Sequence, residues 1–152
     1  MPNKVTHVLN HAQITRILTS PTGPVAKDLL VRGYRVQARA RKNLDGGLSG
    51  PKRIDTGKLR ASISVQLKRK STNILVVHIG TNVEYALWVH DGTGLYGPMH
   101  RPIRPKTKRY LRFKPKNSST FIYAKLVKGM RPNHFLSDAL EAARIGPQFS
   151  TA

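Results

Sequence analysis

The spacing of apolar residues changes once along the chain, and this change restricts the fold more than any other feature of the sequence. Over residues 24–44 the apolar residues recur at intervals of three and four, which predicts a helix with one apolar face. After Ala61 they recur at every second position, which predicts a half-buried strand. A long helix followed by alternating strands indicates an α+β domain.

The predicted helix over residues 24–44 has two chemically different faces. Pro24 suits its first turn, where a backbone N–H would have no partner within the helix. One face is apolar and includes Gly33 and Ala40, whose small size would let another backbone approach closely. A shorter amphipathic helix is predicted before it, over residues 8–18. The opposite face of the long helix points outward and consists of Asp28, Arg32, Arg35, Arg39 and Lys42.

Two hairpins and a last helix are predicted after the long helix. The first hairpin spans residues 63–79 with its turn at 69–72, and the second spans residues 110–127 with its turn at 117–119. Asn133 is expected to cap the last helix. We therefore predict an α+β fold, with a mostly antiparallel sheet of two hairpins, a long N-terminal helix and a C-terminal helix. The inner face of the C-terminal helix is predicted to be Leu136, Ala139, Leu140 and Ala143.

The length of 152 residues suits one domain, 1–152, because a chain of this size buries about 68–70% of its unfolded surface. Within it, the glycine-rich residues 43–56 predict a long flexible loop, and residues 146–152 a short polar tail. The longest aliphatic run, Ile74 to Val77, is far shorter than the roughly 20 residues of a membrane span. Polar residues interrupt any apolar region near the start, so we expect no signal peptide and a cytoplasmic site of synthesis.

The charge of the chain is strongly one-sided. It has 27 Lys and Arg against 7 Asp and Glu, a formal net charge of +20, whereas surfaces shaped only for solubility carry about 2–8. Nucleic acid or acidic protein surfaces are the expected partners. The densest basic segment, residues 101–116, contains no acid but includes Tyr110 and Phe113, of which Phe113 shares the register of Leu111 and is expected in the core. Its basic residues are Arg101, Arg104, Lys106, Lys108, Arg109, Arg112, Lys114 and Lys116.

This segment predicts attraction to a polyanion backbone without sequence reading. Asp55, Glu84 and Asp91 are expected to flank this basic surface and to pair with part of its charge.

Signals for catalysis are weak. Gly92, Gly94 and Gly97 have the spacing of a dinucleotide-binding motif, but the prolines that follow forbid the helix which that motif requires. The chain has no cysteine, which excludes disulfides, thiolate nucleophiles and zinc ribbons. His90 and Asp91 would need a turn to bring them together as an acid–base pair. We therefore predict no catalytic residue, metal or cofactor. The histidines are His7, His11, His78, His90, His100 and His134.

Three segments together resemble the tail-component family of long-tailed bacteriophages, whose members are small neck proteins described as head–tail connector or tail-completion proteins. The segments are DTGKLRASI (55–63), HIGTNVEYALWVHDGT (78–93) and RPNHFLSDAL (131–140). The last departs from the usual Pro-Phe-Leu pattern, because Asn133 and His134 separate Pro132 from Phe135. The motif positions are Asp55, Thr56, Gly57, Leu59, Arg60, Gly80, Thr81, Asn82, Tyr85, Ala86, Gly92 and Thr93.

The resemblance implies a non-enzymatic structural protein of the virion, located in the neck and assembled in the host cytoplasm. Its expected form is a homo-oligomeric ring that joins the head connector to the tail tube around DNA. Its implied partners are connector or stopper, tail terminator and tail-tube proteins, and the DNA backbone. A ring of about six copies, the favoured number, would carry about +120, so DNA phosphates or acidic neighbours would have to offset the repulsion.

Two motif regions also have local interpretations. Asp55 or Thr56 can cap a short helical turn, and Gly57 permits tight geometry there. Trp88 lies in a short amphipathic segment and either packs in the core, which we expect, or anchors a subunit interface. Two other functions stay open from the residues alone: a free nucleic-acid-binding protein and, less favoured, a small nuclease.

Overall fold

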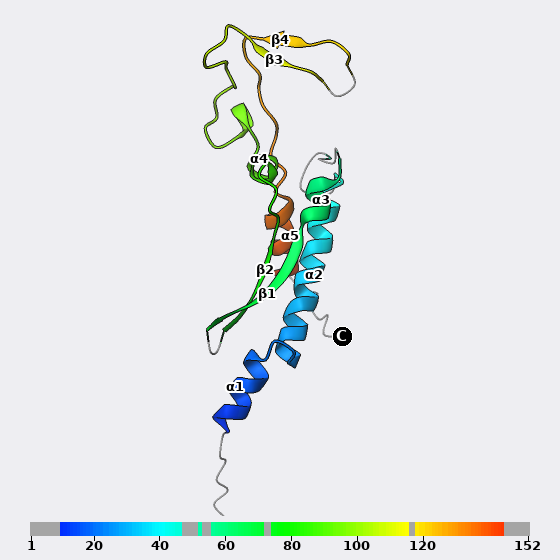
Figure 1. Cartoon of the computed structure of the whole chain (residues 1–152), viewed down its shortest axis with the longest axis vertical. Helices are drawn as coiled ribbons and strands as arrows, with labels where there is room; N and C mark the ends of the chain where they lie inside the picture. Colours follow the sequence, from blue (N-terminus) through cyan, green and yellow to red (C-terminus); the bar gives the residue numbers. More distant parts are fainter. Residues whose placement is uncertain (1–9, 47–51, 53–55, 72–73, 116–117, 145–152) are drawn as a thin grey trace, which may run out of the picture.

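The computed structural model describes residues 10–46, 52, 56–71, 74–115 and 118–144. Its elements extend along one axis, with α1 at one end, the β3–β4 hairpin at the other, and α2, α5 and the β1–β2 hairpin between them (Figure 1). The helices are α1 (His11–Thr19), α2 (Pro24–Leu44), α3 (Lys58–Ser62), α4 (Ala86–Asp91) and α5 (Phe135–Arg144). The strands are β1 (Ser64–Ser71), β2 (Ile74–Gly80), β3 (Leu111–Phe113) and β4 (Ile122–Ala124).

Helix α2 has the bounds predicted from the sequence, with Pro24 as its first residue. Its apolar face lies against the β1–β2 hairpin and α5. A Cβ atom at Gly33 would lie 2.8 Å from Val77 Cγ1 and 2.9 Å from Val65 Cγ1. The helix and the hairpin therefore approach each other closely at Gly33, as the small residue predicts.

The β1–β2 hairpin is antiparallel, with Val65 opposite Ile79 and Leu67 opposite Val77. Val65 and Leu67 are half-buried while the residues between them are exposed, which confirms the predicted alternation. Strand β1 continues through Ser71, past the start of the predicted turn at 69–72, because a register shift between Arg69 and Ser71 lets the pairing resume.

The β3–β4 hairpin forms a second two-stranded sheet, separate from the first within the described residues. Leu111 pairs with Ala124 and Phe113 with Ile122, and a bridge between Ile103 and Val127 extends the pairing. These elements confirm the α+β class with two antiparallel hairpins. The expected core position of Phe113 is wrong: its exposed fraction is 41%, because β3 packs mainly against β4 and contributes little to the protein interior.

The buried core joins α2, α3, α4 and α5. Two buried asparagines form hydrogen bonds within this core. The Asn43 side-chain amide donates to the Phe135 carbonyl at 3.1 Å, and the Asn133 side-chain amide donates to the Asn43 backbone carbonyl at 3.3 Å. Both are buried, so they lock the end of α2 to the start of α5. The core residues are Val36, Ala40, Leu44, Leu59, Ile63, Ala86, Val89, Phe135 and Ala139.

Three details at the ends of α2 and α5 correct the sequence predictions. Asn43 and Leu44, which the predicted helix 24–44 and the predicted loop 43–56 both include, belong to α2 and are buried. Most of that loop lies outside the described residues, as does the tail 146–152. Asn133 lies two residues before the first residue of α5. The α5 face that is buried begins with Phe135 rather than Leu136, so the predicted inner residues Leu140 and Ala143 are exposed.

None of the helices in the described part of the chain has both the length and the apolarity that crossing a bilayer requires.

Candidate functional site

The first motif segment forms the turn before α3. Gly57 adopts a left-handed conformation (φ +77°) at the N-cap of α3, and the backbone N–H of Lys58 donates to Thr56 Oγ1 at 3.4 Å. Leu59 then enters the core. The structure thus contains the short helical turn predicted here, but its N-cap is Gly57, so no N-cap side chain makes a capping hydrogen bond. Asp55 lies outside the described residues.

Other motif residues join neighbouring elements. Arg60 forms an ion pair of 3.3 Å with Asp45 at the end of α2; both groups are largely exposed, so the pair contributes at most about 1 kcal/mol. Thr81 Oγ1 accepts a hydrogen bond from the Val83 N–H at 3.2 Å and shares a second one with the Ser62 hydroxyl. Thr81 therefore links the residue after β2 to the last residue of α3.

The Gly92–Thr93 motif begins the part of the chain that leads to the distal β3–β4 hairpin. The Thr93 N–H donates to the Met130 carbonyl at 2.9 Å, and the Met130 N–H donates back to Thr93 Oγ1 at 2.9 Å. The Leu95 N–H donates to the Lys128 carbonyl at 2.7 Å. These bonds clamp the outgoing and returning segments together at the base of the hairpin.

Glycine is required at this clamp. Gly129 has φ +92°, and a Cβ atom there would overlap the Thr93 carbonyl. Gly92 and Gly94 also have positive φ and lie against the backbone of residues 128–132. The glycine spacing that resembles a dinucleotide motif therefore serves close backbone packing, and a 3-10 turn over Gly94–Tyr96 follows it in place of a long helix.

The basic segment 101–116 lies on the distal hairpin and the chain leading to it. All of its described basic residues are exposed, and the ion pairs among described residues leave them without an acidic partner. Asp91 was expected to pair with this segment, but its Oδ1 lies 2.7 Å from His90 Nδ1 instead. Glu84 makes no ion pair with the segment among described residues, and Lys116 and Asp55 lie outside them.

The aromatic residues of the distal hairpin contact its arginines. The Arg112 guanidinium lies 3.8 Å from the centroid of the Phe121 ring, and that of Arg109 lies 5.5 Å from the Tyr110 ring. Such cation–π contacts hold the positive charge at the surface.

The basic stripe on α2 is a second, separate surface. Arg32, Arg35, Arg39 and Lys42 are exposed, as predicted, and Arg32 pairs with Asp28 at 2.8 Å. This stripe lies along the middle of the molecule, whereas the basic segment lies toward the distal end (Figure 1). The fold does not merge the two into one patch.

Large apolar side chains are also exposed, which the sequence did not lead us to expect. Trp88 is 59% exposed, so the core position favoured for it is wrong. The reason is that the short helix α4 buries only the face of Ala86 and Val89, which turns Leu87 and Trp88 outward. Consecutive apolar residues, which no single buried face can accommodate, were the available signal. Other exposed apolar residues near the distal end are Met99, Phe113, Phe121, Ile122, Tyr123 and Leu126.

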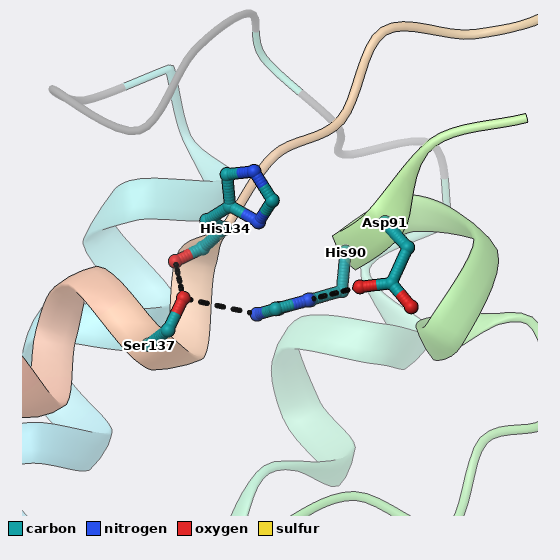
Figure 2. A network of polar contacts seen from close by, with 4 residues as sticks. All are labelled: His90, Asp91, His134 and Ser137. Carbon is teal, nitrogen blue, oxygen red and sulfur yellow. Dashed lines mark hydrogen bonds and ion pairs between the residues drawn. The ribbon is translucent and has the colours of Figure 1, made fainter. Parts of the chain in front are cut away.

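A polar network lies where α4 ends and α5 begins (Figure 2). His90 Nδ1 and Asp91 Oδ1 are 2.7 Å apart, so the helical turn does bring this pair together. His90 Nε2 lies 3.2 Å from the Ser137 hydroxyl, and His134 lies beside them. His78 and His100 are exposed elsewhere, and His7 lies outside the described residues.

A scan against family models matched residues 24–92 to the HK97-gp10-like family, described as "Bacteriophage HK97-gp10, putative tail-component". The match runs from the first residue of α2 to the residue after α4, and it contains the segment 55–63 and all but the last residue of the segment 78–93. The searches of curated proteins and of solved structures gave no match. Over residues 24–92 the chain is therefore similar to a family of phage tail components, which supports a structural protein of the phage tail.

Proposed function

We propose that this protein forms a ring in the virion neck, joins the head connector to the tail tube around DNA, and catalyses no reaction. The single observation that carries the proposal is the exposure of apolar side chains on two separate elements of an elongated subunit. Ile14, Ile17 and Leu18 are exposed on α1, and Leu87 and Trp88 on α4. Apolar surface of this kind marks contacts with other proteins.

The two apolar surfaces favour assembly through unlike faces. A head-to-tail contact uses one surface of a subunit and a different surface of the next, and repeated rotation closes a ring. The surface on α1 and that on α4 lie on opposite sides of α2 along the long axis (Figure 1). Such an arrangement supports a ring, with about six copies favoured, and neighbouring connector or stopper, tail terminator and tail-tube proteins as further partners.

The basic surfaces supply the second part of the proposal. The segment 101–116 has no acidic partner among the described residues, so its positive charge is available to an anionic partner. Phosphates of threaded DNA meet this need without sequence reading, and acidic faces of neighbouring rings meet it equally. The basic stripe on α2 is proposed to face the acidic surfaces of neighbouring rings.

The experiment is charge reversal in the basic segment. A variant with glutamate at four positions of the segment should fail to form rings in negative-stain electron microscopy, or should form particles that lose DNA. A control variant replaces four exposed lysines elsewhere with glutamate, so that it has the same net charge as the first variant. Unchanged assembly and DNA retention in the first variant would refute the role of the segment. The reversed positions are Arg101, Arg104, Lys106 and Lys108 in the variant, and Lys27, Lys58, Lys68 and Lys70 in the control.

A free nucleic-acid-binding protein is the alternative, supported by the same uncompensated segment. It predicts a monomer with a steep dependence of DNA or RNA affinity on salt. Sedimentation of the purified chain separates the two proposals, because the ring requires an oligomer.

A further inference from the structure

Two histidines and an aspartate meet where α4 ends and α5 begins. His90 and Asp91 are the last two residues of α4, and His134 directly precedes α5. Each offers one atom that can bind a metal, and these atoms all lie within 4.8 Å of one another. We propose that His90, Asp91 and His134 bind one divalent transition metal of the kind that prefers imidazole ligands, with Zn²⁺ as its representative.

The distances fit a site that closes on the ion. Adjacent ligands of a tetrahedral Zn²⁺, with bonds of about 2.0–2.2 Å, lie roughly 3.3 Å apart. The present maximum of 4.8 Å must therefore shorten. His134 is exposed, so its ring can turn toward the ion, whereas the partly buried His90 and Asp91 stay in place.

The orientation of His90 is the strongest support. Its Nδ1 lies 2.7 Å from Asp91 Oδ1, so these two atoms lie side by side and can bind the same ion, while Nε2 lies 3.2 Å from the Ser137 hydroxyl on the other side of the ring. The buried Phe135 ring packs edge-on against His90 at 5.6 Å and limits the movement of that imidazole.

The serine in the network does not turn it into a hydrolytic site. Asp91, His90 and Ser137 follow one another in hydrogen-bonded order, as in a nucleophilic triad. However, the Ser137 hydroxyl also lies 3.3 Å from the His134 carbonyl, to which it can donate its proton. A second ring nitrogen from His134 nearby favours the metal.

A metal here would link two segments that are distant in the sequence. It would tie α4 to the entrance of α5, directly beside the clamp of Thr93 and Met130 from which the distal hairpin extends. The ion would thus fix the direction of that hairpin relative to the core.

The test is calorimetric titration of the full-length chain, without a histidine tag, with ZnCl₂. We expect one ion per chain. His90→Ala, Asp91→Ala and His134→Ala should each weaken binding at least tenfold, because each removes one ligand atom. The control is His11→Ala, which disrupts the only other closely spaced histidine pair, His7 and His11, and should leave the affinity unchanged. Circular dichroism verifies that each variant is folded.

A second readout is thermal unfolding. Zn²⁺ should raise the melting temperature of the wild type and of His11→Ala, because an ion that binds only the folded state stabilises it. It should not raise the melting temperature of His134→Ala, which lacks one ligand. The proposal is overturned by the absence of saturable binding, by equal affinity in His134→Ala and the wild type, or by loss of binding in His11→Ala alone. None of these results bears on whether the protein forms a ring.

Discussion

Single glycines at two turns show how the same backbone conformation can serve different needs. Gly57 and Gly129 both have positive φ, but a Cβ atom at Gly57 would meet nothing within 4 Å, whereas one at Gly129 would overlap the Thr93 carbonyl. At Gly57 only conformational preference is at stake. At Gly129 the clamp itself depends on the missing side chain.

Substitution of each glycine by alanine separates these two causes. Gly57→Ala should lower the free energy of unfolding by about 1–2 kcal/mol, the cost of a left-handed residue with a side chain. Gly129→Ala should cost about 2 kcal/mol more, because the backbone must also move. Urea unfolding followed by circular dichroism measures both. Equal losses in the two variants would show that the clamp tolerates a side chain.

Among the elements, the contact between α2 and α5 depends on a buried polar pair. Asn43→Ala removes the donor to the Phe135 carbonyl and leaves that acceptor buried. The free energy of unfolding should fall by about 1–3 kcal/mol. Lys42→Ala, at the neighbouring exposed position, should change it by no more than about 0.5 kcal/mol. The prediction fails if chemical denaturation gives the two variants the same stability.

The elements also show how far the sequence predicts the fold. Helix α2 and the β1–β2 hairpin follow from local periodicity, because each buries one continuous face against the other. The orientation of Trp88 and Phe113 does not follow, since it depends on which elements cover α4 and β3. The inner face of α5 differs from the prediction because Phe135, which the predicted face left out, is the first residue of the helix and is buried.

The candidate sites divide in the same way. Exposure of the basic segment and of the α2 stripe followed from charge and spacing alone. The network of His90 and His134 did not, because the distal hairpin separates these residues in the sequence and only the packing of α4 beside α5 unites them.

At the scale of the whole molecule, the exposed side chain of Trp88 tests assembly. Trp88→Ala should reduce the mass measured by sedimentation velocity from the oligomer toward the monomer. The stability of the monomer should change by less than about 1 kcal/mol, because Trp88 contributes little to the core. A loss of about 3–5 kcal/mol would instead place the indole in a packed interior. Trp88→Phe, which keeps an aromatic ring, should retain most of the assembly.

Salt dependence tests the basic segment of the whole chain. Each phosphate contact contributes about 0.9 to the slope of log affinity against log salt concentration. Glutamate at Arg101, Arg104, Lys106 and Lys108 should therefore reduce the slope for duplex DNA by up to about 3.6. Fluorescence anisotropy at several salt concentrations provides the measurement. An unchanged slope would assign the segment to an acidic protein partner.

The clamp at Thr93 and Met130 means that the chain leaves the body of the protein and re-enters it at one place. The residues between Thr93 and Met130, which include β3 and β4, therefore form an insertion whose two ends meet at this clamp. Its length and chemistry can vary without repacking the interior, since neither strand contributes to the buried core. The family match ends at Gly92, directly before the clamp residue Thr93. We therefore expect that this insertion can be replaced without disturbing residues 24–92, so that the same core could contact different partner proteins.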